Sequence, residues 1–129
     1  MKDIFKTSKG KYVAPSPIEM KLSVNKNIEQ VCVVGDSIPQ PIALVVLSDR
    51  GKIKKEVDIF YSLSTTLDSV NDDLDPHEKI HNIIILDSSW TIENKLITPT
   101  MKIKRNNIEK MYRKHYNTWY TEKTISFVE

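Results

Sequence analysis

The stretch IEQVCVVGDSIPQPIALVVLS, residues 28–48, carries the clearest structural signal in the sequence. Two apolar runs rich in β-branched residues, 28–34 and 41–48, flank a turn signal at Gly35-Asp36-Ser37. Such runs predict two neighbouring strands at the centre of a sheet. Cys32 lies inside the first run, where a small buried hydrophobic residue is expected instead of a reactive thiol.

Upstream of these strands, residues 5–13 predict a tight hairpin that turns near Gly10, a residue that tolerates positive φ. Ser16-Pro17-Ile18-Glu19 is a helix-start signature: a capping serine, a proline at the first helical position and a glutamate that reaches back. The sequence therefore predicts a short helix that buries Ile18 and Leu22.

Downstream, apolar residues at helical spacing predict one long amphipathic helix over residues 53–74. These residues are Ile53, Val57, Phe60, Leu63, Leu67, Val70 and Leu74. Asp75-Pro76-His77-Glu78 is a second capping signature, and it opens a short helix before an apolar strand at residues 83–86. Residues 88–101 are expected to form a loop.

Residues 106–119 predict a last helix, on which one broad face carries Ile108, Met111, Tyr112, His115 and Trp119. Together these elements predict an α+β fold. We expect a small central three-stranded β-sheet flanked by helices, with an N-terminal β-hairpin.

The composition describes an ordinary globular chain of 129 residues, 40% of them hydrophobic and 28% charged. No apolar run approaches the length of a membrane span, and the amino terminus lacks the features of a secretory signal. A single cysteine excludes an internal disulfide and is typical of a reducing compartment, so we expect a cytoplasmic protein.

Charge is distributed unevenly, although 19 basic and 17 acidic residues give a formal net charge of only +2. Residues 101–114 are basic and residues 56–78 are acidic. This asymmetry fits either a local site for phosphate or carboxylate groups or solvated faces of opposite sign. Aromatic residues interleaved with the basic stretch could stack on bases, but helix packing explains them as well. No nucleic-acid motif is present, so we expect no nucleic-acid partner.

Residues 77–81, HEKIH, fit the H-E-x-x-H pattern of zinc enzymes. The helix that opens at Pro76 must end before the strand at residue 83, which makes it too short for an active-site helix. His115 is the one remaining histidine and has no flanking pattern of a third ligand. We therefore predict no metal site in this chain.

Two segments stand out as a pair: KDIFKTSKGKYVAPSPIE at residues 2–19 and LITPTMKIKR at residues 96–105. The first is a glycine hairpin that carries several cations and whose backbone could pass close to a ligand. The second is a loop stiffened by Pro99 that presents Lys102 ahead of a basic stretch. A loop lysine considered alone is usually only solvated.

Both segments resemble motifs in the C-terminal domain of AMP-forming acyl-CoA ligases, which belong to the adenylate-forming superfamily. The first resembles the hinge and hairpin that begin this domain. The second resembles the motif that bears the catalytic lysine, in the form found in long-chain acyl-CoA synthetases. Order and separation also agree, and the resemblance covers nearly the whole chain.

The resemblance implies a role for several residues. Lys2 and Asp3 match the hinge about which this domain rotates between two half-reactions. Lys102 matches the catalytic lysine that bridges carboxylate and phosphate oxygens during adenylation. The tunnel for the pantetheine arm of CoA is expected along Lys9, Gly10 and Lys11.

Several residues depart from the resembled motifs. Met101 stands where the wider superfamily has glycine before the lysine, which favours the long-chain branch. Lys9 and Lys95 stand where long-chain relatives often have glycine. Lys104 and Arg105 are expected to begin a solvated basic run without a part in the chemistry.

The whole chain, residues 1–129, is therefore expected to be the lid domain of a larger ligase that converts a fatty acid to acyl-AMP and then to a CoA thioester. ATP and Mg²⁺ would be bound mainly by a large N-terminal domain, absent from this chain, and CoA would be the co-substrate. The chain alone is expected to be inactive, and the resemblance allows peripheral membrane association of the full enzyme.

Two alternatives remain open at this level: a fatty-acyl-AMP ligase or other adenylate-forming enzyme, and a small basic module that binds nucleic acid or protein.

Overall fold

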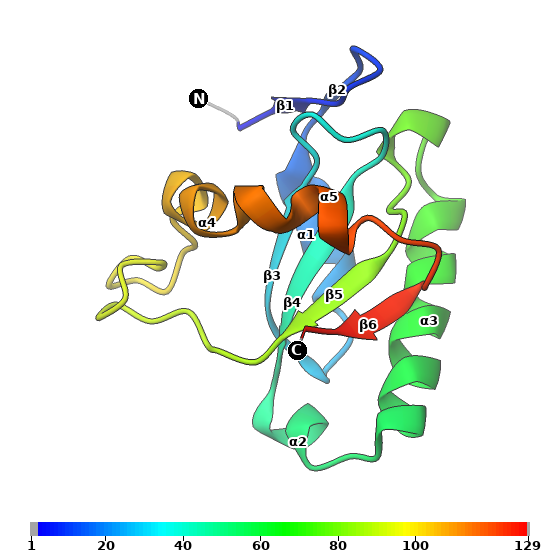
Figure 1. The fold of residues 1–129 in the computed structure, drawn as a ribbon. Coiled ribbons are helices and arrows are strands. Elements are labelled where there is room, and N and C mark those ends of the chain that lie inside the picture. The colour runs from blue at the N-terminus through cyan, green and yellow to red at the C-terminus, as the bar shows by residue number, and fades with distance from the viewer. Residues whose placement is uncertain (1–2, 129) are drawn as a thin grey trace.

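A mixed four-stranded sheet forms the centre of the protein in the computed structural model, which describes residues 3–128 (Figure 1). The strands lie in the order β3 (Ile28–Val34), β4 (Ile42–Leu47), β5 (Ile83–Leu86) and β6 (Ile125–Phe127). β3 and β4 are antiparallel, whereas β5 pairs parallel to both β4 and β6. The three predicted strands are confirmed. The prediction of three strands omitted β6, so the sheet has one strand more than expected.

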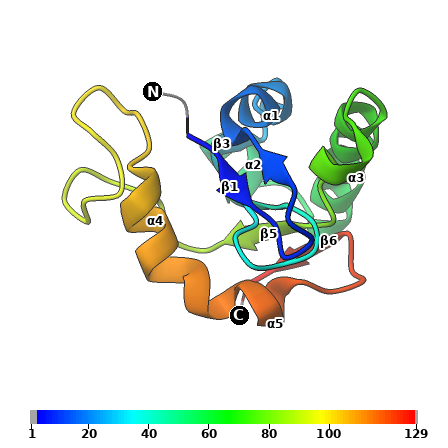
Figure 2. The ribbon, with the colours of Figure 1, turned by 90° about the horizontal axis from the view of Figure 1, so that it is seen from above.

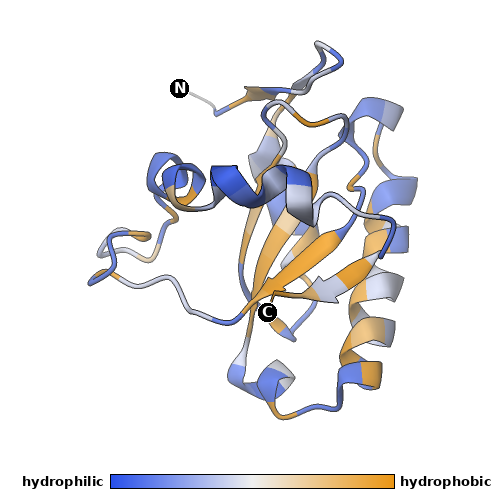
Figure 3. Cartoon of the chain, in the orientation of Figure 1, coloured by the Kyte–Doolittle hydropathy of each residue, from blue (hydrophilic) through white to orange (hydrophobic). Residues whose placement is uncertain are grey.

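The two central strands are buried along their whole length, because the sheet is covered on both faces. Every residue of β4 and β5 is buried, which explains why these strands are continuous apolar runs without polar alternation. Figure 3 shows the apolar residues gathered in the sheet. The α+β architecture is confirmed.

Helices α1 (Pro15–Leu22) and α3 (Glu56–Asp72) cover one face of the sheet, and α4 (Arg105–Tyr112) and α5 (Tyr116–Trp119) cover the other. Figure 2 shows these two layers on opposite sides of the strands. The first layer buries Ile18, Leu22, Leu63 and Leu67, and the second buries Ile108 and Tyr116. The predicted burial of Ile18 and Leu22 is confirmed.

The N-terminal hairpin is confirmed, with β1 (Phe5–Lys6) antiparallel to β2 (Tyr12–Val13). Gly10 has φ +79°, in the left-handed region that glycine adopts without strain. The first helix begins two residues earlier than predicted, at Pro15, after Ala14. Ser16 is therefore not its cap, and Glu19 does not reach back to the helix start.

The predicted single helix over residues 53–74 is wrong in its first turn. A short helix, α2 (Asp49–Lys52), forms first because the Ser48 hydroxyl accepts a hydrogen bond from Gly51 N–H at 3.1 Å. Ile53 ends that turn and is 87% exposed, and Val57, in the first turn of α3, is 67% exposed. The buried stripe therefore starts at Ile59.

The capping signature at Asp75 is confirmed, because Asp75 and Glu78 form a capping box at the 3₁₀ helix η1 (Pro76–Glu78).

The last helix is divided by a second 3₁₀ turn, η2 (Arg113–His115), between α4 and α5. Of the predicted apolar face, His115 within this turn and Met111 on α4 are exposed instead of packing on the sheet. None of the helices within residues 3–128 is long and apolar enough to cross a membrane.

Candidate functional site

Lys102 lies at the end of a small hairpin-like turn that closes residues 98–102. Thr98 N–H donates to the Lys102 carbonyl oxygen at 2.7 Å, and Met101 N–H donates to the Thr98 carbonyl oxygen at 2.8 Å. Lys102 N–H donates to the Thr98 hydroxyl at 3.1 Å. Just outside the turn, Ile97 and Ile103 form an antiparallel bridge. The predicted loop therefore has a defined backbone where it carries Lys102.

Met101 adopts φ +70°, in the left-handed region that disfavours side chains with a Cβ. Lys95 has φ +66°. By the resemblance, the wider superfamily has glycine at the first position and long-chain relatives often have it at the second. The positive φ gives a physical reason for that residue type, because glycine adopts it without strain. The local geometry is kept here despite the larger side chains, because hydrogen bonds close the turn around Met101.

The Lys102 side chain is exposed and lines a groove of about 890 Å³ between the lysine turn, α1 and β3. Acidic residues on the groove wall are Asp3, Glu19 and Glu29. Among the ion pairs of residues 3–128, none involves Lys102. Its ammonium group is therefore available to a ligand that carries phosphate or carboxylate oxygens.

Arg105 is not part of a solvated run, so the expectation for this residue is wrong. Its guanidinium nitrogens Nη1 and Nη2 donate to the two carboxylate oxygens of Glu19 at 2.7 and 2.8 Å. Only 12% of the Arg105 side chain and 11% of the Glu19 side chain are exposed. Lys104, in contrast, is exposed as expected.

The environment of Arg105 keeps it charged. Burial by itself lowers the pKa of Arg105. The hydrogen bond to Glu19, together with the charge interactions with Cys32 and Glu19 and the hydrogen bond to Asp3, more than offsets this effect, so the pKa lies above its ordinary value. The neighbouring Cys32 thiol is fully buried, and burial together with the Glu19 charge raises its pKa well above the usual range. The expectation of a buried, unreactive Cys32 is consistent with this environment.

The predicted hinge is described only in part. Lys2 lies outside the described residues. Asp3 is exposed, and its carboxylate lies 3.4 Å from Arg105 Nε. The hinge segment therefore touches the residue that follows the lysine turn, a contact between positions 102 residues apart in sequence.

The three predicted tunnel residues lie at the tip of the N-terminal hairpin, and all three are exposed. Thr7 N–H donates to the Lys11 carbonyl oxygen and Gly10 N–H to the Thr7 carbonyl oxygen, both at 2.9 Å. Figures 1 and 2 both place this tip away from the lysine turn. The structure therefore presents Lys102 and the segment Lys9-Gly10-Lys11 on different parts of the surface.

The histidines of the zinc-like pattern do not share a helix face, because η1 ends at Glu78. His81 instead stacks on Tyr120 with ring centroids 4.1 Å apart. The C-terminal aromatic residues pack on one another, since the ring centroids of Tyr112 and Trp119 lie 5.8 Å apart. Tyr116 is buried, which leaves it unavailable for stacking on a nucleic-acid base.

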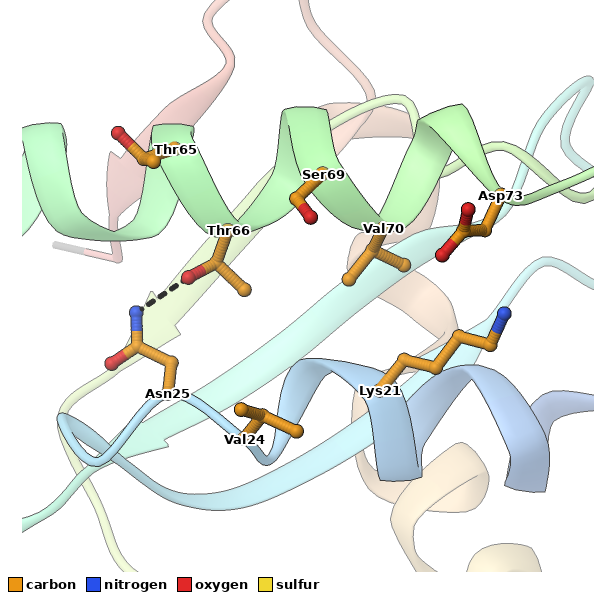
Figure 4. A pocket seen from close by; sticks show the side chains of 8 residues that line it. All are labelled: Lys21, Val24, Asn25, Thr65, Thr66, Ser69, Val70 and Asp73. Carbon is orange, nitrogen blue, oxygen red and sulfur yellow. Dashed lines mark hydrogen bonds between the residues drawn. The ribbon is translucent and has the colours of Figure 1, made fainter.

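A second groove, of about 510 Å³, lies between α1 and α3 (Figure 4). Asn25 Nδ2 donates to the Thr66 hydroxyl at 2.8 Å at one end, and Lys21 and Asp73 lie at the other. None of the site residues predicted from the sequence lines this groove.

The functional side chain that could not be recognised from the sequence is Glu19. The sequence pattern assigns it to a helix cap, and in the structure it anchors Arg105.

Comparison with known proteins gives a consistent result over almost the whole chain. A family profile described as the AMP-binding enzyme C-terminal domain matches residues 2–124. Long-chain-fatty-acid–CoA ligase 5 of Mus musculus is 27% identical over 92% of this chain, and long-chain-fatty-acid–CoA ligase 1 of Homo sapiens is 27% identical over 93%. This chain spans about a fifth of the length of these relatives, 20% in each case.

Solved structures share the fold. The A-PCP didomain of carboxylic acid reductase from Segniliparus rugosus, in complex with AMP, superposes with a TM-score of 0.76 at 24% identity. The match covers 92% of this chain and 17% of that one. The adenylation domain of the carboxylate reductase from Mycobacterium chelonae gives a TM-score of 0.77 at 21% identity, over 91% of this chain and 19% of that one. These structures establish the fold of the chain.

Proposed function

The chain belongs to the family of AMP-binding enzyme C-terminal domains, and from this premise we propose that it is the lid domain of a long-chain fatty-acid–CoA ligase. The observation that carries the proposal is the closed turn that presents the ammonium of Lys102, which forms no ion pair within residues 3–128, in a chain similar along its length to long-chain-fatty-acid–CoA ligases. The complete enzyme activates a fatty acid with ATP and transfers the acyl group to CoA.

In the first half-reaction a fatty-acid carboxylate attacks the α-phosphorus of ATP, and pyrophosphate leaves. Two anions must approach each other, and negative charge builds up on the phosphorus oxygens. A positioned ammonium group between carboxylate and phosphate oxygens offsets that repulsion. Lys102 has the required charge and exposure, and its backbone is held by the hydrogen bonds of the turn.

In the second half-reaction the CoA thiol attacks the acyl carbonyl, and AMP leaves. The hairpin tip at Lys9-Gly10-Lys11 then lines the pantetheine path. Gly10 leaves room there, because it has no side chain and, apart from its two chain neighbours, the nearest heavy atom to the position of a Cβ is Lys6 Cε at 4.0 Å. Presentation of the hairpin and of Lys102 on different parts of the surface fits a lid that turns between two steps.

Most of the substrate-binding machinery belongs to a partner domain. Within residues 3–128, no three His, Cys, Asp or Glu side chains come together to hold a metal ion. The residues present here do not fit a Mg²⁺ site, and we assign Mg²⁺, adenine and the acyl pocket to a large N-terminal domain. A fatty-acyl-AMP ligase would share the first step only, and the names of the curated relatives favour CoA as acceptor.

The test uses a joined enzyme, in which this chain follows the large domain encoded upstream of it. Where none is encoded, the large domain of the mouse long-chain-fatty-acid–CoA ligase 5 takes its place. We expect the joined enzyme to form acyl-CoA from ATP, fatty acid and CoA, and the chain alone to form none. Acyl-CoA formation by the chain alone, or none by either joined enzyme, would contradict the proposal.

We also propose a cytoplasmic location, with peripheral association to membranes that supply the fatty acid. The single Cys32 is unpaired, as is typical of a reducing compartment. Exposed Ile53, beside Lys52 and Lys54, supports membrane contact. Flotation with anionic phospholipid vesicles tests the membrane contact of Ile53. Ile53→Asp should reduce vesicle binding, whereas Met20→Asp on α1 should not. Equal binding by both variants would exclude this contact.

A further inference from the structure

Arg105 and Glu19 form a forked ion pair that ties together three elements of the fold. The two short hydrogen bonds between guanidinium and carboxylate fix both planar groups relative to each other. Glu19 Oε2 also accepts the backbone N–H of Val33 at 2.7 Å. The carboxylate of α1 therefore holds the first residue of α4 against the edge strand β3.

This pair lies at the base of the lysine turn. Arg105 is the third residue after Lys102, and all three side chains of Glu19, Lys102 and Arg105 line the same groove. Lys104 lies between Lys102 and Arg105 in the sequence, and its N–H donates to the Leu96 carbonyl oxygen at 2.8 Å. This bond joins the two arms of the turn to each other, and Arg105 ties the second arm to Glu19 of α1, so the turn cannot tilt freely on the end of α4.

We infer that Glu19 and Arg105 are positioning residues for Lys102. The inference rests on the proposed function of Lys102. The ion pair sets the direction in which the turn presents the ammonium group, whereas the hydrogen bonds within the turn set only its local shape. Bidentate geometry suits this role, because two parallel hydrogen bonds resist rotation and a single one does not. Asp3, 3.4 Å from Arg105 Nε, extends the same link to the hinge segment.

Two conservative substitutions separate the geometry of the Arg105–Glu19 pair from its charges. Arg105→Lys keeps the positive charge and loses the fork, and Glu19→Gln keeps the shape and loses the negative charge. The control is Arg113→Lys, because Arg113 on the same helical stretch pairs with Asp36 at 3.2 Å and is 57% exposed. Arg113 lies outside the groove that contains Lys102.

In the joined enzyme, the readout is the ratio of fatty-acid-dependent ATP–pyrophosphate exchange to thioester formation from supplied acyl-adenylate. We expect both groove variants to lower this ratio at least tenfold, and Arg113→Lys to leave it within twofold of wild type. The ratio does not depend on how much protein is folded, because unfolded molecules contribute to neither step. An unchanged ratio in both groove variants overturns the inference.

A second measurement, on the chain alone, does not depend on the proposed function. Amide hydrogen exchange at Met101 and Lys102 should accelerate at least tenfold in Arg105→Lys. Exchange at Gly10 and Lys11 should stay the same, because no ion pair among residues 3–128 anchors their turn. If exchange accelerates at neither turn or at both, Arg105 is not a specific anchor of the lysine turn. If exchange responds as expected and the wild-type joined enzyme performs neither half-reaction, the proposed function fails and the anchoring role remains.

Discussion

Lys102 and Lys11 occupy equivalent positions in two turns that are built alike. In each turn, a threonine N–H donates to the lysine carbonyl oxygen, at 2.7 Å for Thr98 and 2.9 Å for Thr7. In each, the lysine N–H donates to the same threonine hydroxyl, at 3.1 and 3.3 Å. The residue before the lysine has positive φ in both, and it is Gly10 in one turn and Met101 in the other. The two turns therefore allow matched experiments.

Met101→Gly should stabilise the chain by about 0.5–1 kcal/mol. A residue with a Cβ in the left-handed region costs roughly 1–2 kcal/mol, and part of that gain is lost because glycine increases the entropy of the unfolded chain. Equilibrium urea unfolding of the chain measures the change. A loss of stability would show that contacts of the Met101 side chain outweigh its backbone strain.

Gly10→Ala should have the opposite effect and destabilise the chain by about 1 kcal/mol. A Cβ at this position would meet only Lys6 Cε, at 4.0 Å, so a steric clash does not contribute. Equilibrium urea unfolding of the chain also measures this loss of stability. A neutral result would mean that the hairpin tip relaxes to another conformation at little cost.

Gly35→Ala tests how the hairpin is attached to the rest of the fold. A Cβ on Gly35 would overlap the ring of Phe5 in β1, so the ring must move. We expect a loss of about 1–3 kcal/mol in stability, together with faster amide exchange at Ser8, whose N–H donates to the Ile38 carbonyl oxygen at 3.0 Å. Unchanged exchange at Ser8 would show that the hairpin is held without the Phe5 contact.

Cys32 should not react with aromatic disulfide reagents at pH 8 while the chain is folded. Burial, and then the Glu19 charge, raise the pKa of the thiol, so the reactive thiolate is scarce in the folded state. Because the pKa is higher in the folded state, the contribution of this group to stability is complete below its ordinary pKa near 9. It declines as pH rises beyond that value. Rapid labelling without unfolding would contradict this environment.

The sheet could be predicted to the extent that its strands are long and uniformly apolar. β4 and β5 are apolar and buried throughout, and β3 is so from Val31 to Val34, because the sheet is covered on both faces. β6 has three residues, of which only Ile125 is buried, so no pattern in the sequence marks it. Its existence depends on pairing with β5, and such a tertiary contact leaves no local signal.

In the candidate site, too, features with a local sequence signal could be predicted and a long-range contact could not. Lys102 could be found because its motif is contiguous, and Gly10 because a turn with positive φ favours glycine. The role of Glu19 could not be found, because its partner Arg105 lies 86 residues away and a glutamate near a helix start also fits a cap. The expectation that Arg105 is solvated failed for the same reason.

The central claim is that Lys102 acts in adenylation and not in thioester formation. In the joined enzyme, Lys102→Ala should lower fatty-acid-dependent ATP–pyrophosphate exchange by at least about a hundredfold, because one positioned charge donor in a closed site contributes ~3 kcal/mol. Thioester formation from supplied acyl-adenylate should change little. Lys104→Ala is the matched control, since Lys104 is exposed and lies two residues away. Arg105 cannot serve as a control, because it is largely buried and paired with Glu19. Wild-type exchange in Lys102→Ala, or an equal loss in Lys104→Ala, would contradict the claim.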